Sequence, residues 1–371
     1  MNMTGSPSRR PPTTTPRTLP GPATRRSVAL LASGVLAALA LALALAAPAG
    51  SSRGRAAGGT TKTSARAVGA PRQASSHGPS YMTGIGDEQE EMFANPLWRQ
   101  LRMKIVRYIV PYDTMAHPYW VQRAARWIKA AEAQHQRVLV SFYHSEYVPT
   151  RMPSVALYQH DVTRFIKQFP FVREYQAWDE ENRGDVSGLF VSPTAVQSAQ
   201  YYQALKRSCE PCTVIGLDVL DQNNIYPTLA YIAEFKHEIH QLHTLMPSVW
   251  GLHDYSDLNR LESWRTRDLA QALGGEVWLT ETGGIVKFGG ELPNNRGSGL
   301  RRAARVLGYM FGVARSNSRI KRLYIYDWTG GNSSTRFDAG LMNAHDQPRE
   351  GYTVVCRQLH AARCGVRIAG N

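Results

Sequence analysis

Two stretches decide the fold of this chain: Tyr175-Gln176-Ala177-Trp178-Asp179-Glu180-Glu181-Asn182 and Val277-Trp278-Leu279-Thr280-Glu281-Thr282-Gly283-Gly284. Each begins as a short apolar run, which is typical of a buried strand. Each then presents a glutamate, Glu180 or Glu281, just past the run. A carboxylate is costly to bury unless it is paired or hydrogen-bonded, so two such placements indicate a functional site.

Similar apolar runs recur from residue 80 onward and alternate with amphipathic segments. We expect strands over 81–86, 104–110, 137–143, 174–178, 213–217, 249–253, 276–279 and 322–328. Helical spacing of apolar residues predicts helices over 119–134, 155–168, 194–208, 229–246 and 299–316. Strands that alternate with helices indicate parallel strands joined by crossovers.

Eight strand–helix units over residues 80–371 fit an α/β fold of the (β/α)₈ TIM-barrel type. A doubly wound open sheet is the competing architecture, and it requires a glycine-rich phosphate loop after an early strand. Gly84-Ile85-Gly86-Asp87 stands at the end of the first strand, but no third glycine comes three residues later. We therefore expect the parallel eight-stranded barrel.

The formal net charge of +14 is concentrated at the N-terminus. Residues 1–79 contain ten of the 43 basic residues and none of the 29 acidic ones. The remaining chain is only mildly basic, so the charge gives little support to a nucleic-acid partner.

The N-terminal segment resembles an export signal. Residues 28–47 are almost wholly Ala, Leu and Val, follow Arg25-Arg26, and precede the small-x-small pattern Ala47-Pro48-Ala49. The apolar run is also long enough to remain as a membrane anchor. We expect 1–49 to be a signal peptide or anchor, 50–79 a disordered linker, and 80–371 the folded domain, secreted or held at the outer face of the membrane.

Four cysteines lie in the folded part, an even number that suggests disulfides outside the cytosol. Their spacing favours the pairs Cys209–Cys212 and Cys356–Cys364, although sequence alone does not fix connectivity. Cys209-Glu210-Pro211-Cys212 also has the form of a redox motif, but its place between a helix and a strand favours a structural clip.

In a barrel of this kind, catalytic groups lie at the C-terminal ends of the strands. Glu180 follows the fourth expected strand and Glu281 the seventh. Most enzymes that cleave glycosidic bonds use two carboxylates held on either side of that bond.

The chain resembles the clan A glycoside hydrolases, and most closely the family 39-like secreted actinobacterial enzymes. The resemblance covers about residues 80–352 and rests on these motifs: Gly84-Ile85-Gly86-Asp87, Trp178-Asp179-Glu180-Glu181-Asn182, Gly251-Leu252-His253-Asp254-Tyr255, Trp278-Leu279-Thr280-Glu281-Thr282-Gly283 and Tyr324-Ile325-Tyr326-Asp327-Trp328. It implies a barrel with an acid/base glutamate after the fourth strand and a nucleophilic glutamate after the seventh.

The resemblance makes Glu180 the acid/base and Glu281 the nucleophile. The residue before the acid/base is usually Asn, which contacts the sugar; here it is Asp179, which accepts hydrogen bonds but does not donate them when ionised. An ionised Asp179 is expected to raise the pKa of Glu180. Glu181 also departs from the usual residue, whereas Asn182 keeps the pattern.

Five further side chains lie on or just past expected strands and are candidates for contacting the substrate or the nucleophile: Arg107, His144, His253, Tyr255 and Trp328. Of these, Arg107 is the one that the resemblance itself implies. We expect Arg107 to pair with Glu281, and His253 and Tyr255 to donate to Glu281 or to the sugar. Trp328 is either a platform for a sugar ring or part of the core, and Arg107 and His144 also have purely structural interpretations.

The sequence thus predicts an exported retaining glycoside hydrolase, a monomer that acts on an oligo- or polysaccharide with no metal and no cofactor. One alternative is a carbohydrate-binding barrel with weak or lost catalysis, which the departures at Asp179 and Glu181 suggest. A metal-dependent hydrolase is a further alternative, against which the absence of an evident His/Asp ligand motif argues.

Overall fold

A computed structural model describes residues 81–185, 188–359 and 364. The expected signal or anchor (1–49) and linker (50–79) lie outside the described residues. Among the helices of the described part, none is both long enough and apolar enough to cross a bilayer.

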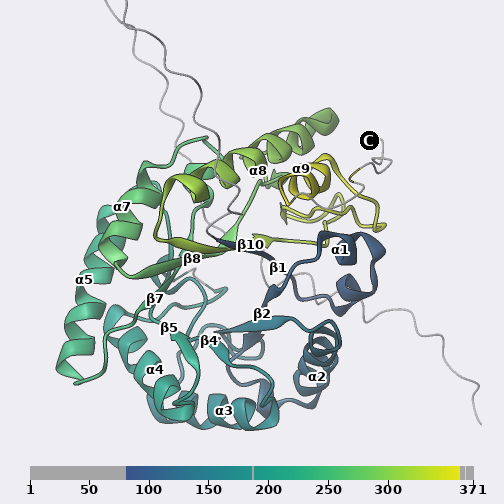
Figure 1. Cartoon of the computed structure of the whole chain (residues 1–371). Coiled ribbons are helices and arrows are strands. Elements are labelled where there is room, and N and C mark those ends of the chain that lie inside the picture. Colours follow the sequence, from purple (N-terminus) through teal and green to yellow (C-terminus); the bar gives the residue numbers. More distant parts are fainter. Residues whose placement is uncertain (1–80, 186–187, 360–363, 365–371) are drawn as a thin grey trace, which may run out of the picture. The chain divides into compact units, whose positions relative to one another are not determined.

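Nine parallel strands form one sheet in the order β5-β4-β3-β2-β1-β10-β8-β7-β6 (Figure 1). Their bounds are β1 Met82–Gly86, β2 Ile105–Pro111, β3 Arg137–Tyr143, β4 Glu174–Gln176, β5 Thr213–Ile215, β6 Asp218–Leu220, β7 Val249–His253, β8 Glu276–Thr282 and β10 Ile320–Tyr326. Every neighbouring pair in this order runs parallel. A separate antiparallel pair joins β9 (Lys287–Phe288) to β11 (Phe337–Asp338).

The sheet closes on itself through one divided strand. The two ends of the order, β5 and β6, are separated only by Gly216 and Leu217. The Gly216 amide donates to the Val249 carbonyl at 3.0 Å, and the Gly251 amide donates to the Leu217 carbonyl at 2.7 Å. Together β5 and β6 are the fifth strand of an eight-stranded barrel, which confirms the predicted (β/α)₈ fold.

Helices follow most of the strands and surround the barrel (Figure 1). The longer ones are α2 Pro118–Ala133, α3 Val155–Gln168, α4 Ala195–Ser208, α5 Tyr226–Gln241, α7 Trp264–Leu273, α8 Ser298–Ser316 and α9 Glu350–Gln358. The shorter ones are α1 Pro96–Leu101, α6 Tyr255–Leu258 and the 3₁₀ turns Glu90–Ala94, Thr114–Ala116, Glu181–Arg183 and Asn295–Gly297.

Capping side chains explain where some of these helices begin. The Ser154 hydroxyl accepts from the Leu157 amide at the start of α3, and Thr194 and Gln197 form a reciprocal capping box at the start of α4. Each bond satisfies an amide that would otherwise have no partner in the first helical turn.

Side chains of each strand alternate between two cores. Along β2, Val106 and Tyr108 belong to the large core between the strands and the helices. Ile105 instead joins a small cluster of residues drawn from five strands, which therefore lies inside the barrel: Ile105, Leu139, Ile215, Trp278 and Tyr324. This inner cluster fills part of the barrel interior.

An ion pair crosses the barrel near the N-terminal ends of the strands. Glu174 in β4 accepts from Arg322 in β10 at 2.5 and 3.0 Å, and it also bonds Arg137 in β3. The Arg322 guanidinium lies 3.5 Å from the centre of the Trp278 ring. Glu174 and Arg322 are both buried, so the pair links opposite sides of the barrel within a site of low dielectric.

Both expected disulfides are present: Cys209–Cys212, with Cα atoms 5.4 Å apart, and Cys356–Cys364, with Cα atoms 5.6 Å apart. The first closes the turn between α4 and β5, as the interpretation of a structural clip predicted. The second attaches the end of α9 to residue 364.

Candidate active site

Glu281 lies within β8, at a point where the strand register is irregular. In the pairing with β7, Leu252 faces Leu279, but the next residue, His253, faces Glu281. The pairing of β8 with β10 shifts in the same region. Strict alternation would point Thr280 and Glu281 to opposite faces, whereas in this bulge the Thr280 hydroxyl and the Glu281 carboxylate both bond groups inside the barrel.

Glu180 follows β4 in a segment that is tied to β6. Its backbone is left-handed, with φ 52° and ψ 55°, a conformation that is rare for a residue with a side chain. Glu181 Oε2 accepts from the Asp218 amide at 2.6 Å. The Asn182 side chain accepts from the Leu220 amide at 2.7 Å and donates to the Leu220 carbonyl at 3.1 Å. These bonds hold the strained turn that presents Glu180.

Arg107, in β2, joins carboxylates that come from three different parts of the barrel. Its Nη1 donates to Glu281 Oε1 at 2.7 Å, so the predicted pairing is present. Its Nη2 bonds Asp179 and lies 3.5 Å from Asp218 Oδ2. Burial opposes a charge on this side chain, but Asp179 and Glu281 outweigh it and raise the pKa of Arg107. Arg107 therefore remains a fixed cation at the base of the site.

His253, at the end of β7, lies between the two glutamates. Its Nδ1 is 3.1 Å from Glu180 Oε1 and 3.7 Å from Glu281 Oε2, and its Nε2 is 2.8 Å from Asp218 Oδ2. Burial alone would lower the pKa of the imidazole, but Asp218 and Glu281 raise it well above its usual value. The ring is therefore an imidazolium, with a proton on each nitrogen.

The two distances from Nδ1 of His253 limit the separation of the glutamates. Oxygens of Glu180 and Glu281 that share this neighbour lie at most roughly 7 Å apart, a range that includes the separation of about 5–5.5 Å found in retaining glycosidases. The Tyr255 hydroxyl donates to Glu281 Oε2 at 3.3 Å. Glu281 thus accepts bonds from Arg107 on one oxygen and from Tyr255 on the other.

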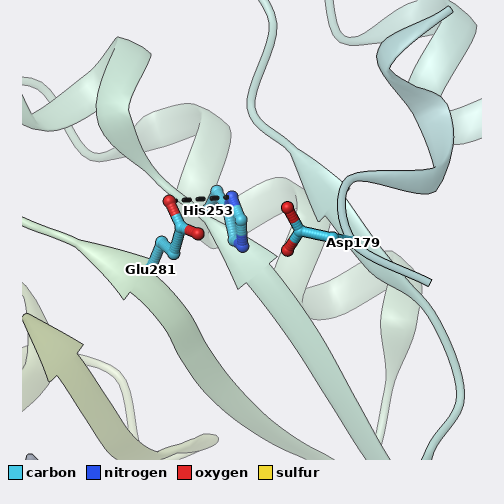
Figure 2. Close-up of side chains that lie close together, drawn as sticks. All are labelled: Asp179, His253 and Glu281. Atoms are coloured by element: carbon cyan, nitrogen blue, oxygen red, sulfur yellow. Dashed lines mark ion pairs between the residues drawn. The ribbon is translucent and has the colours of Figure 1, made fainter. Parts of the chain in front are cut away.

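Asp179, His253 and Glu281 point toward one another, as Figure 2 shows. One ligand atom from each lies within 4.8 Å of the others, so the three are also of the right kind and spacing to hold a metal ion. This cluster could not be seen in the sequence, because the three residues come from three separate strand ends. Arg107 bonds both carboxylates of the group, and a guanidinium charge in that position opposes the binding of a divalent cation.

Protonation in this site differs from the expectation. Burial raises the pKa of Asp179 to about 7, against the opposing charge of Arg107. Burial would also raise the pKa of Glu180, but Arg183, whose Nη1 lies 2.9 Å from Glu180 Oε2, and His253 together lower it. The expected rise in the pKa of Glu180 is therefore wrong, because the two cations dominate over burial and the charge of Asp218.

Two of the predicted substrate contacts do not join the central group. His144 is buried between the Tyr143 and Phe190 rings, with centroids 4.1 and 5.8 Å away, and burial lowers its pKa. Trp328 is completely buried in the large core and packs against Tyr352 at 6.0 Å. Trp328 therefore packs as a core residue, which is the alternative that the sequence left open for it, and not beside Glu180 and Glu281.

Asp218, Arg183 and Tyr326 are parts of the site that the sequence analysis missed. Asp218 is the first residue of β6, after the interruption that divides the fifth strand. Arg183 stands three residues after Glu180, a spacing that could have suggested the contact. Tyr326 ends β10 and donates to Glu88 Oε2 at 3.3 Å; after burial, Glu88 is the chief cause of its raised pKa, and Glu281 adds to it.

No protein-family model matches the sequence, and no curated protein matches it. Solved structures do match. A family 39 glycoside hydrolase from Bacteroides cellulosilyticus WH2 aligns at 14% identity with a TM-score of 0.50, over 76% of this chain and 63% of its own length. The chain therefore spans less than two thirds of that enzyme.

Two other structures are covered more fully. Xylanase 10B from Thermotoga maritima aligns at 14% identity with a TM-score of 0.54, over 76% of this chain and 95% of the xylanase. A family 5 glycoside hydrolase variant from Bifidobacterium longum subsp. longum, in complex with Manβ1-4GlcNAc, aligns at 13% identity with a TM-score of 0.53, over 78% of this chain and 80% of its own. The structural neighbours are clan A glycoside hydrolases, and at these identities the likeness shows the shared barrel fold.

Proposed function

We propose that this protein is a retaining glycoside hydrolase that cleaves O-glycosidic bonds of an oligo- or polysaccharide. The observation that carries the proposal is the convergence of Glu180 and Glu281 on one atom, Nδ1 of His253, at 3.1 and 3.7 Å. The neighbouring barrels belong to glycoside hydrolases, one of which was crystallised with a disaccharide. The resemblance to family 39 in particular stays a prediction.

Glu281 is the nucleophile in this proposal. Its carboxylate attacks the anomeric carbon while the bond to the leaving oxygen breaks, and the bonding electrons pass to that oxygen. Glu180 protonates the leaving oxygen and later removes a proton from the water that releases the sugar from Glu281. Arg107 and Tyr255 fix the two oxygens of the nucleophile. The sugar keeps its anomeric configuration because the carbon is inverted twice.

Glu180 must hold a proton when the bond breaks, although its pKa is lowered before substrate binds. The imidazolium of His253 can supply this proton once bound substrate has raised the pKa of Glu180, because its Nδ1 lies 3.1 Å from Glu180 Oε1. Weakening the contact between Arg183 and Glu180 would raise the pKa of Glu180, since the charge of Arg183 is the largest cause that lowers it.

The nucleophile assignment is tested by substitution and by covalent trapping. Glu281→Gln should lower kcat by at least about 10³-fold on 4-nitrophenyl glycosides while the protein still folds, because the amide does not attack the anomeric carbon. A 2-fluoroglycoside should label the parent protein on Glu281, as read by mass spectrometry of peptides. Glu91→Gln, on the exposed surface, is the matched control and should leave both results unchanged.

A folded Glu281→Gln protein that kept more than a few per cent of the parent rate would refute the role of Glu281. If the parent protein bound sugars but was never labelled, the alternative of a carbohydrate-binding barrel without catalysis would replace the proposal.

We further propose that the protein acts outside the cytoplasm as a monomer. The signal-like N-terminal sequence and the pairing of all four cysteines support export. Cell fractionation checks this location, and gel filtration with light scattering checks the mass in solution.

A further inference from the structure

Arg183 is a buried cation beside the proposed acid/base. Its side chain is 6% exposed, and its Nη1 lies 2.9 Å from Glu180 Oε2 and donates to the Tyr143 hydroxyl at 3.0 Å. The flat face of the guanidinium lies over the Phe190 ring, 4.3 Å from its centre. The contacts of Nη1 and the stacking on Phe190 therefore fix the position of the guanidinium.

The remaining edge of this guanidinium has no partner among the described residues. Both Nε and Nη2 of Arg183 are buried and form no hydrogen bond within that part of the chain. These two nitrogens lie on the same side of the guanidinium, where their N–H bonds run parallel and match the two oxygens of a carboxylate. Leaving charged donors unpaired at a buried position is unfavourable, which indicates a binding role.

We propose that Arg183 binds the carboxylate of an acidic sugar, so that the substrate of this enzyme contains a uronic acid next to the bond that is cleaved. The inference rests on the proposed glycoside hydrolase function and specifies its substrate class. Arg183 is in contact with Glu180, so a carboxylate on its free edge belongs to one of the two sugars that the cleaved bond joins. A neutral hexose has a hydroxymethyl group at that carbon, which forms no charged two-point contact.

The same contact connects substrate recognition to the acid. A carboxylate bound to Arg183 partly neutralises the guanidinium, whose charge acts on Glu180 when no substrate is bound. The pKa of Glu180 then rises toward its ordinary value. Glu180 is then protonated more readily for the first step. His144 lies close enough for Arg183 to help lower its pKa after burial, so it stays neutral and does not compete as a second cation.

The binding test uses the full-length Glu281→Gln protein, so that the result does not depend on turnover. Calorimetry compares 4-nitrophenyl glucuronides and galacturonides of both anomers with the matched neutral hexosides. We expect at least one uronide to bind about tenfold more tightly than its neutral counterpart, as two charge-assisted hydrogen bonds allow. Equal affinity, or binding of no uronide, would overturn the proposal.

The kinetic test compares Arg183→Met and Arg183→Lys with the parent. On a uronide, Arg183→Met should lower kcat/KM by about 100-fold more than on the neutral glycoside, and Arg183→Lys should fall between, because lysine keeps the charge but not the two-point contact. Arg336→Met is the control, since this exposed arginine also stacks on a phenylalanine, at 5.5 Å, and should change neither rate.

Equal losses on uronides and neutral glycosides would show that Arg183 only positions Glu180, and would overturn the assigned substrate. Cleavage of neutral glycosides with no preference for uronides would leave the hydrolase function intact and remove this inference alone. Uronide binding without any covalent labelling or cleavage would instead remove the hydrolase function.

Discussion

Asp218 is the residue on which the charge of His253 depends. Its Oδ2 lies 2.8 Å from His253 Nε2, and its Oδ1 accepts a hydrogen bond from the Thr280 hydroxyl. Burial would raise the pKa of Asp218, but His253 outweighs burial and lowers it, so the carboxylate stays ionised. In return, Asp218 is the largest charge that holds His253 in its imidazolium form. This pair therefore determines whether Nδ1 of His253 can give a proton to Glu180.

Asp218→Asn should narrow the pH range of activity. Without this carboxylate the pKa of His253 falls, so the imidazolium is lost at a lower pH. The alkaline limb of the kcat/KM profile on a 4-nitrophenyl glycoside should then move down by about one pH unit or more. Thr280→Val, which removes a hydrogen bond to Asp218 but not its charge, should give a smaller shift. An alkaline limb that stayed in place in Asp218→Asn would contradict the role of this residue.

The two glutamates could be predicted because each directly follows the apolar run of a buried strand, a place where a carboxylate is unusual unless it has a function. Arg107 was suggested by the family resemblance and Tyr255 by its place just past a strand, and their contacts with Glu281 are present. Arg183 was missed because its contact depends on the left-handed turn at Glu180, which no local pattern signals. For Trp328 the choice stayed open because an aromatic residue just past a strand can face either the site or the core.

The fifth barrel strand is the element that closes the fold, and it does so with an interruption at Gly216. A Cβ atom added at this residue would lie 2.5 Å from Pro247 Cβ and Cγ and 2.9 Å from Trp250 Cε3. The lack of a side chain thus lets β5 and β6 approach the segment that leads into β7. The division also points Asp218 into the barrel beside His253.

Gly216→Ala should destabilise the protein by about 1–3 kcal/mol, because the new methyl group overlaps two packed side chains. Gly308→Ala is the matched control in α8, where the nearest atom to the added carbon, Val354 Cγ1, is 4.0 Å away. That substitution should stabilise the protein by up to about 1 kcal/mol, since alanine favours a helix more than glycine does. Urea denaturation followed by circular dichroism measures both. Similar effects of the two substitutions would mean that Gly216 is not under steric constraint.

Elements with regular periodicity were predicted closely. The strands 137–143 and 249–253 and the helix 155–168 have the expected bounds. By contrast, β8 extends to Thr282, beyond the predicted end at residue 279, because the bulge lets polar side chains continue the strand. The division of the fifth strand was not predicted, since 213–217 looks like one short strand and pairing with two different neighbours is a property of the closed barrel.

The barrel as a whole is joined across its interior by Glu174 and Arg322, far from the proposed chemistry. Strands on opposite sides of a closed sheet share no backbone hydrogen bonds, so side chains connect them: this pair and the inner apolar cluster near one end, and the contacts of Arg107 with Asp218 and Glu281 at the site. The position of Arg322 over the Trp278 ring adds a cation–π contact to the ion pair.

Glu174→Gln should destabilise the barrel by about 3–5 kcal/mol, because it leaves the buried guanidinium of Arg322 without its carboxylate. Glu90→Gln is the surface control: Glu90 pairs with Arg126, which is 58% exposed, and its loss should cost less than about 1 kcal/mol. Both values come from urea denaturation. If the two substitutions cost the same, the interior pair would not contribute to holding the barrel closed.

The closure at residues 213–220 divides the working groups of the site between two consecutive halves of the chain. Arg107 and Glu180 precede this junction, and His253 and Glu281 follow it. A chain severed at this point would yield two fragments, each with one of the paired acids and neither with a complete reaction centre. Recovery of hydrolysis on mixing such fragments would then serve as a direct reporter of the docking of half-barrels.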